Sequence, residues 1–383
     1  MKLALVGVGQ AGGKVVDALL DYERRSGGSF VTDALAVNSA KADLLGVRNV
    51  PPERRVLIGQ SRVKGHGVGA DNDLGVEIAR EDAGEVLGAL DDLPTHEVDA
   101  FLVVAGLGGG TGSGGAPVLA RRIGEIYTEP VYGLGVLPGR DEGGIYTLNA
   151  ARSFQTFVGE VDNLIVFDND AWRAGGESLE GGYDRINEEL ARRLGVLFNA
   201  GEVSNGVVPE SVVDASEVIN TLAAGGVTSI GYASAAVERR KRSFFAKPEA
   251  PDATETINRI TSTVRRATLG RLTVPVDVRS TERALVVVSG PPDHLSRKGV
   301  DEARKWVEST TGTMEVRGGD YPVPDSDSVS ALVVLSGVTD IARVRELQQV
   351  AIEAKRNIGE IAERSDVAFD DLLSGGDDLD PVF

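Results

Sequence analysis

The run Gly108–Gly114 (GGGTGSG) places seven small residues where strand and helix signals meet. It follows the apolar stretch Phe101–Ala105, which is typical of a buried parallel strand. Ala116–Tyr127 comes next, with helical spacing and Pro117 near the expected first turn. Unpaired backbone N–H groups at a helix start bind phosphate, and this context argues against a flexible surface loop. The predicted phosphate loop consists of Gly108, Gly109, Gly110, Thr111, Gly112 and Ser113, whose two hydroxyls add donors.

A second glycine pattern, GVGQAGG at residues 7–13, fits GxGxxG after the first apolar stretch. Alone it suggests a dinucleotide site, and hence an NAD(P)-dependent oxidoreductase with a Rossmann fold. Such a site needs an acidic residue at the end of the second strand, where this chain has Asn38 and Ser39. The Walker A pattern fails too, because Val15 rather than Ser or Thr follows Lys14. The dinucleotide interpretation also leaves the second glycine run unexplained.

Asp214 and Glu217 are carboxylates three residues apart at the start of a short helical pattern. Residues at this spacing share one side of a helix, and acidic side chains favour a helix N-terminus. Taken alone, the pair therefore indicates N-capping by Asp214, with Glu217 as its capping-box partner.

Strand and helix patterns alternate over residues 1 to 175, which predicts a doubly wound parallel sheet. Such sheets bind ligands at the carboxyl ends of their strands. The expected strands are Lys2–Val6, Asp33–Val37, Arg55–Ile58, Ala100–Ala105, Val131–Val136 and Asn163–Phe167. The expected helices are Gly12–Ser26, Ala40–Leu45, Asp73–Asp91, Gly115–Tyr127 and Tyr146–Val161.

A long helical pattern, Tyr183–Val203, separates this half from an α+β unit that begins near Ser211. The unit's expected strands are Thr228–Ala235, Arg283–Ser289 and Ser330–Ser336. Its expected helices are Ala215–Ala223, Leu295–Ser309 and Ile341–Glu363. The acidic, glycine-rich last twenty residues are expected to be disordered.

Composition narrows the function classes. The 383 residues carry a net charge of −18, which argues against general nucleic-acid binding. There is no cysteine, which excludes disulfides and thiolate zinc sites. The 31 arginines against 9 lysines, together with the acidity, favour a halophile's salty cytoplasm, the alternative being an acidic mesophile with a GC-rich genome. No apolar run approaches a membrane span and no signal peptide is recognised, so a cytoplasmic protein is expected.

GGGTGSG resembles the signature of the tubulin/FtsZ superfamily of self-assembling GTPases, and the other loops fit it. The resemblance implies a Rossmann-type GTP-binding domain at 1–178, a central helix at 179–208, an α+β GTPase-activating domain at 209–362 and an acidic tail at 363–383. It also implies GTP or GDP with Mg²⁺ as cofactors, the Mg²⁺ being carried by the nucleotide and no side chain being assigned as a metal ligand. The implied contact residues are Gly9, Gln10, Ala11 and Gly12 in the first loop, Asn38 and Ser39 in the second, Gly67, Gly69 and Ala70 near the γ-phosphate, and Pro138 and Glu142 at the ribose.

Guanine recognition needs a donor and an acceptor together, and an amide side chain offers both. Asn169, which follows an apolar strand, and Asn187 are the candidates. Tyr183 lies four residues before Asn187, so a ring and an amide share one face at the start of the long helix. The same pair resembles the base-binding Tyr and Asn of tubulin's central helix.

The resemblance gives Asp214 and Glu217 a second interpretation as catalytic residues. In tubulins and FtsZs, the acidic loop after the central helix enters the next subunit's nucleotide pocket and polarises the attacking water. Hydrolysis would then require a head-to-tail filament and would be slow. Two departures bear on its rate: no basic residue follows Glu142–Gly143, and Ala40 stands where FtsZ commonly has aspartate. A non-hydrolysing regulator of a paralogue's filaments therefore remains an alternative.

The segments Val37–Lys41 and Gly59–Arg62, with the acidic charge, are most similar to the archaeal CetZ group of tubulin-like proteins. This likeness implies a cytoskeletal role in cell shape, in the cytoplasm or at the inner face of the envelope. The basic run Glu238–Phe245 is a candidate for lateral sheet contacts or for peripheral contact with anionic lipid, the alternative being a solvated loop.

Overall fold

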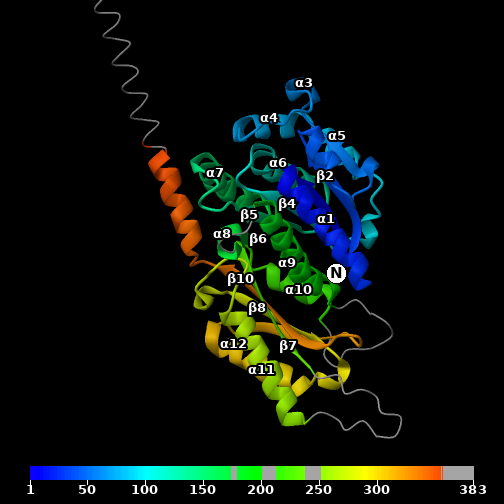
Figure 1. Ribbon diagram of the computed structural model, residues 1–383, viewed down its shortest axis with the longest axis vertical. Coiled ribbons are helices and arrows are strands. Elements are labelled where there is room, and N and C mark those ends of the chain that lie inside the picture. The colour runs from blue at the N-terminus through cyan, green and yellow to red at the C-terminus, as the bar shows by residue number, and fades with distance from the viewer. Residues whose placement is uncertain (174–178, 201–212, 238–251, 355, 357–383) are drawn as a thin grey trace, which may run out of the picture.

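Within the described residues, the strands form one ten-stranded sheet in the order β3-β2-β1-β4-β5-β6-β7-β10-β8-β9 (Figure 1). The computed structural model describes residues 1–173, 179–200, 213–237, 252–354 and 356. The strands from β3 to β6 are parallel, and buried apolar runs fill β1, β4, β5 and β6. They are β1 (Leu3–Val8), β2 (Val31–Asn38), β3 (Arg55–Leu57), β4 (Ala100–Gly106), β5 (Val131–Leu137) and β6 (Asn163–Asp168).

The carboxy-terminal half continues this sheet. Strand β7 (Val227–Ala236) pairs parallel with β6 at Leu164 and Ile165. Strand β10 (Ser328–Val338) then runs antiparallel to both β7 and β8 (Arg283–Gly290), and β9 (Glu315–Pro322) forms the edge, parallel to β8. A parallel α/β half followed by a mixed α+β half is the fold class expected from the sequence, which is thereby confirmed.

Helices cover both faces of the sheet. One face carries α1 (Gly9–Ser26), α2 (Lys41–Leu45), α8 (Asn169–Trp172), α9 (Leu179–Asn199) and α10 (Ala215–Leu222). The other carries α4 (Asn72–Glu81), α5 (Ala83–Gly88), α6 (Gly110–Ile126), α7 (Gly144–Glu160), α11 (Ala253–Leu269) and α12 (Arg297–Thr311). Shorter pieces are α3 (Gln60–Val63) and the 3₁₀ turns Pro52–Arg54, Thr95–Glu97, Val278–Ser280 and Pro292–His294. A helix over residues 342–354 follows β10.

Two helices begin earlier than the sequence predicted. Helix α1 begins at Gly9 instead of Gly12, and α6 begins at Gly110 instead of Gly115. Much of each glycine-rich loop is therefore the first turn of a helix. The glycines let this turn pack closely against its neighbours: a Cβ on Gly112 would lie 2.8 Å from the Gly106 carbonyl oxygen, and one on Gly114 would lie 2.4 Å from that of Asn72. The predicted position of Pro117 in a first turn was wrong, because α6 begins at Gly110 and Pro117 lies inside it.

Other expectations were shifted or incomplete. The single helix expected over Asp73–Asp91 is two helices, α4 and α5, separated at Asp82. Helix α11 and strand β9 were not predicted at all. The basic run Glu238–Phe245 and the last twenty residues lie outside the described residues.

Helix α9 runs from the carboxyl ends of the parallel strands to their amino ends. Its predicted stripe is buried, with Ile186, Leu190 and Leu194 at most 1 % exposed. Near its end, the Phe198 carbonyl accepts a hydrogen bond from the amino group of Met1 at 2.9 Å, beside the start of β1. Twenty-one residues of helix span about 30 Å, which separates Tyr183 from the amino ends of the strands. No described helix combines the length and apolarity that a bilayer span needs.

Candidate functional site

A cavity of about 560 Å³ opens where the parallel strands end. Val8, Asn38 and Gly106, the last residues of β1, β2 and β4, lie in its wall. Open α/β sheets bind ligands at this edge. Most residues predicted to contact nucleotide line the cavity: Gly9, Gln10, Ala11, Asn38, Gly67, Gly69, Gly108, Gly109, Gly110, Thr111, Gly112, Pro138, Glu142, Asn169, Tyr183 and Asn187.

The N-termini of α1 and α6 converge in this cavity. A Cβ on Gly9 would lie 2.8 Å from the backbone nitrogen of Gly112, so the two helix starts almost touch. Their N-cap residues, Val8 and Gly109, supply no side-chain cap. Within the described part of the chain, no acceptor meets the backbone N–H of Thr111 or Gly112. Two helix dipoles with free donors form a cradle for an oligophosphate.

Ser39 lies behind the cavity wall and contacts the phosphate loop. Its buried Oγ lies 2.7 Å from Oγ1 of Thr111, so the two hydroxyls share a hydrogen bond. Asn38 accepts a hydrogen bond from the backbone of Ala40 at 3.1 Å and donates to Asp43 at 3.2 Å. The second loop is therefore fixed from inside, and Ser39 orients Thr111 without lining the cavity itself.

The third loop contributes backbone to the cavity. Gly67 and Gly69 have φ of 81° and 60°, a region that favours glycine. Ala70 does not line the cavity. Its carbonyl accepts a hydrogen bond from Asn149 Nδ2 at 2.7 Å, and the same nitrogen also donates to the Gly108 carbonyl at 3.0 Å. Asn149, on α7, thus ties the third loop to the phosphate loop, a role that sequence reasoning missed.

Two other predicted residues are structural in this geometry. Gly12 does not line the cavity, and a Cβ there would lie 2.2 Å from the Val104 carbonyl oxygen. Ser113 is buried in α6, where its Oγ accepts a hydrogen bond from Asn72 at 2.7 Å. Both residues hold the cavity's helices against their neighbours.

Glu142 and Tyr183 meet in the cavity wall. The Tyr183 hydroxyl donates to Glu142 Oε1 at 2.7 Å, and the Gly139 N–H donates to the same oxygen at 2.7 Å. Burial, reinforced by the Glu142 carboxylate, raises the pKa of Tyr183 well above its ordinary value. The phenol therefore stays neutral and remains a donor.

Asn169 supplies an unused acceptor in the same wall. It is 7 % exposed, and its Oδ1 is a buried atom with no hydrogen-bond partner among the described residues. Buried polar atoms are seldom left unpaired, so the atom points to a ligand with N–H donors. Tyr183 and Asn187, one turn apart on α9, line the same cavity. An amide acceptor beside a second amide and a ring matches the edge and face of guanine.

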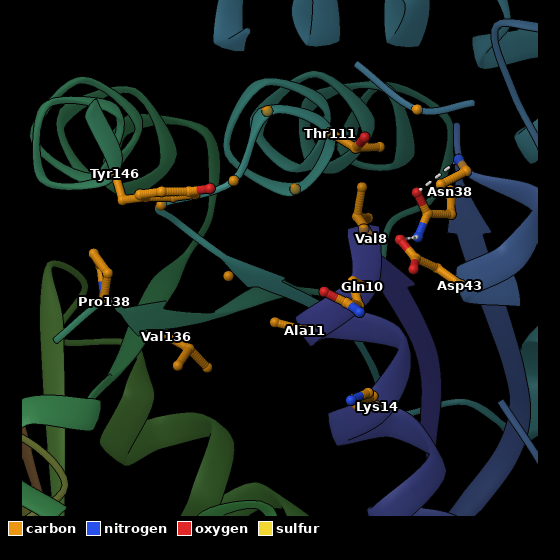
Figure 2. A pocket seen from close by; sticks show the side chains of 18 of the residues that line it. Val8, Gln10, Ala11, Lys14, Asn38, Asp43, Thr111, Val136, Pro138 and Tyr146 are labelled. Atoms are coloured by element: carbon orange, nitrogen blue, oxygen red, sulfur yellow. Dashed lines mark hydrogen bonds between the residues drawn. The ribbon is translucent and has the colours of Figure 1, made fainter. Parts of the chain in front are cut away.

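The cavity wall also contains Lys14 and Tyr146, which the sequence analysis did not select as contact residues. Figure 2 shows Lys14 on α1 near Gln10 and Ala11, with Tyr146 and Pro138 across the cavity. Lys14 adds a positive charge to the cavity wall. It lies one turn after Gln10 on α1, a spacing that could have selected it, but the mismatch to the Walker A pattern led to its rejection. The described residues hold no group of three or more acidic or histidine side chains suited to a metal ion.

Asp214 and Glu217 lie far from this cavity. Asp214 caps α10, where its carboxylate accepts the Glu217 N–H at 3.0 Å, which is the capping contact expected from the sequence. The Glu217 carboxylate does not complete a capping box but pairs with Arg317 Nε at 3.3 Å. In Figure 1, α10 lies beside the N-terminus, at the amino ends of the parallel strands. Neither residue lines the cavity of its own chain.

Comparison with known proteins extends this geometry. The GTPase domain of the tubulin/FtsZ family matches residues 2–175, and the C-terminal domain of tubulin-like CetZ matches residues 176–353. Tubulin-like protein CetZ3 of Haloferax volcanii is 66 % identical over 390 residues, covering the full length of both chains.

Solved structures agree with this likeness. CetZ1 from Haloferax volcanii, a GDP-bound monomer, is 63 % identical and superimposes with a TM-score of 0.85 over 93 % of this chain and 100 % of that one. CetZ2 from the same organism, a GTPγS-bound protofilament, is 49 % identical, with a TM-score of 0.83 over 94 % of this chain and 100 % of that one.

Proposed function

Since the chain belongs to the tubulin/FtsZ family, in its CetZ group, we propose that it binds GTP in the cavity at the carboxyl ends of its parallel strands and polymerises head to tail. The observation that carries the proposal is the separation of Asp214 and Glu217 from that cavity. The relatives support both parts, because one was solved with GDP and another as a GTPγS-bound protofilament. The dinucleotide alternative is set aside, since it accounts for neither the family match nor the second phosphate loop.

Each end of the nucleotide has its own residues in this proposal. The phosphates lie at the N-termini of α1 and α6, with Thr111 held by Ser39. Glu142 accepts from a ribose hydroxyl. Asn169 and Asn187 read the guanine edge, and Tyr183 lies against the ring. The amide oxygen of Asn169, unpaired among the described residues, gains the partner it lacks.

Hydrolysis requires residues that a single chain does not bring together. Asp214 and Glu217 of one copy would accept hydrogen bonds from the attacking water in the cavity of the next copy. The α1 and α6 N–H groups stabilise the charge that develops on the phosphate oxygens. Mg²⁺ carried by the nucleotide would supply the remaining charge neutralisation.

Filaments of this kind suit a cytoskeletal role in archaeal cell shape, in the cytoplasm or at the inner face of the envelope. Lateral association or lipid contact through the basic run Glu238–Phe245 stays a hypothesis. One observation keeps the non-hydrolysing regulator open: Asp214 is engaged as a helix cap and Glu217 is paired with Arg317. To bind the attacking water, each carboxylate must either leave its present partner or use its second oxygen.

Phosphate release from GTP tests the proposal, measured with Mg²⁺ in molar KCl over a range of protein concentrations. Specific activity should rise above a threshold concentration, because the site forms only between copies. Asp214→Asn keeps an N-cap side chain but removes the charge, so it should lower turnover by about 10²-fold without unfolding α10. Asp252→Asn changes the equivalent cap of α11 and should leave turnover unchanged.

Flat, low activity at every concentration, with guanine-specific binding intact, would favour the non-hydrolysing regulator. Absence of guanine binding would overturn the proposed site itself.

A further inference from the structure

A buried arginine links the cavity rim to the helix over residues 342–354. Arg343 has a side chain only 2 % exposed. Its Nη2 donates to the Pro138 carbonyl at 3.0 Å, and its Nη1 donates to Glu346 Oε1 at 2.6 Å. Its Nε lies 3.8 Å from Asp168 Oδ1. One guanidinium therefore joins its own helix to two other segments of the chain.

Arg140 makes a second connection between the same segments. Its Nε donates to Glu346 Oε1 at 2.9 Å and its Nη2 donates to Glu346 Oε2 at 2.6 Å. Its Nη1 also pairs with Asp170 on α8. Hydrogen bonds from Arg140 hold the pKa of Glu346 below its ordinary value, so this carboxylate stays ionised between the two arginines. In Figure 1 the 342–354 helix, drawn in orange, runs past α8 and α7.

The contacted segments are those at the sugar and base end of the cavity. Pro138 begins the turn that carries Glu142, and Asp168 directly precedes Asn169. A buried charge is costly unless it is paired and hydrogen-bonded, so the two hydrogen bonds of Arg343 favour the arrangement of segments that provides them. Its Nε has no hydrogen-bond partner among the described residues and relies on the ion pair with Asp168. Arg343 itself does not line the cavity.

We propose that Arg343, braced by Glu346 and Arg140, is a positioning residue of the nucleotide site: it fixes the Glu142 turn relative to Asn169. This inference rests on the proposed GTP site. Among the described residues, the side-chain hydrogen bonds and ion pairs of Arg343 and Arg140 go to Pro138, Asp168, Asp170 and Glu346 and not to the phosphate cradle at α1 and α6. Loss of Arg343 therefore loosens sugar and base recognition while phosphate binding is retained.

Isothermal titration of the full chain with four probes separates these effects: GTP, ATP, 2′,3′-dideoxy-GTP and inorganic tripolyphosphate, each with Mg²⁺. In Arg343→Ala, GTP affinity should fall about tenfold, as expected for one lost anchoring contact to a charged group. The preferences for GTP over ATP and over the dideoxy analogue should shrink, while tripolyphosphate binding stays unchanged. Arg343→Lys should recover part of the GTP affinity through the Pro138 carbonyl.

Arg345→Ala is the matched control, because Arg345 is two residues away, is 63 % exposed and pairs only with Asp340 among the described residues. It should leave all four affinities unchanged. If Arg343→Ala does not fold, the milder change Glu346→Gln replaces it in the test and should reduce the same preferences. Unchanged preferences in a folded Arg343→Ala or in Glu346→Gln, or an equal loss for all four probes, would overturn the inference. A wild-type chain without a preference for GTP over ATP would overturn the proposed function instead.

Discussion

Asp168 is a residue whose ionisation should affect stability. Burial raises its pKa from 3.8 to about 6, against the lowering effect of Arg343. The folded chain therefore holds the proton more tightly than the unfolded chain, so this residue's contribution to stability falls as pH rises from about 4 to 6. Asp168→Asn mimics the neutral form and keeps the acceptor for the Asp170 N–H. We expect the variant to be more stable at pH 7 by about 1–3 kcal/mol, a gain that vanishes near pH 4.

Denaturant unfolding of both proteins at several pH values measures this difference. Other titrating groups are common to both proteins and largely cancel. Asp170→Asn changes a neighbouring carboxylate that is 26 % exposed, and solvent screening should leave it a smaller effect. A stability difference between Asp168→Asn and wild type that does not vary with pH would show that the raised pKa is not the cause.

Local patterns at the residue scale were sufficient to select most of the cavity wall. Glycine runs after strands and the Tyr183–Asn187 spacing are visible in short windows, and the structure places these residues around one cavity. Asn149 and Arg343 could not be selected in this way. Each acts on a carbonyl distant in sequence, and their own surroundings resemble ordinary helix.

Helix α6 contains a proline whose missing hydrogen bond is replaced from another helix. Pro117 has no N–H for the Ser113 carbonyl. The buried Ser153 hydroxyl of α7 donates to that carbonyl at 2.7 Å. Ser153→Ala should therefore cost about 1–2 kcal/mol of unfolding free energy, because a buried carbonyl loses its partner.

Combining Ser153→Ala with Pro117→Ala tests the cause, since replacing the proline by alanine restores a backbone N–H for the same carbonyl. The cost of Ser153→Ala measured by denaturant unfolding should then largely disappear. Thr156→Ala, on the exposed side of α7, serves as control and should cost less than about 0.5 kcal/mol. An equal cost with and without Pro117 would place the Ser153 effect elsewhere.

The two elements that the sequence analysis missed differ in the strength of their local signals. Helix α11 carries a recognisable signal, because Asp252 caps it and Ile260, Val264 and Ala267 form a buried stripe against β7 and β10. Its many β-branched residues, which have modest helix propensity, obscured that signal. Strand β9 contains Gly318 and Gly319 and ends in Pro322, all unfavourable in strands. It forms because α12 covers it, with Arg304 donating to the Val316 carbonyl at 2.8 Å.

At the scale of the whole molecule, the cavity lies at the carboxyl ends of the parallel strands and the acidic pair lies at their amino ends. Helix α9 spans about 30 Å between these two ends. A molecule with two different complementary ends associates head to tail, and such an interface leaves one free end of each kind. The net charge of −18 opposes this association at low salt, because like-charged copies repel. Molar salt is therefore the condition under which a shared site should form.

Mixing two inactive variants tests whether the site is shared. Asp214→Asn retains the cavity, whereas Asn169→Ala with Asn187→Ala retains the acidic pair but loses guanine reading. Each alone should release little phosphate. In an equimolar mixture, random order joins an intact cavity to an intact acidic pair at about a quarter of interfaces, so about a quarter of wild-type turnover should return. The measurement is phosphate release against total protein in molar KCl. Turnover equal to the sum of the separate variants would contradict catalysis between copies, because only a shared site can be complemented by mixing.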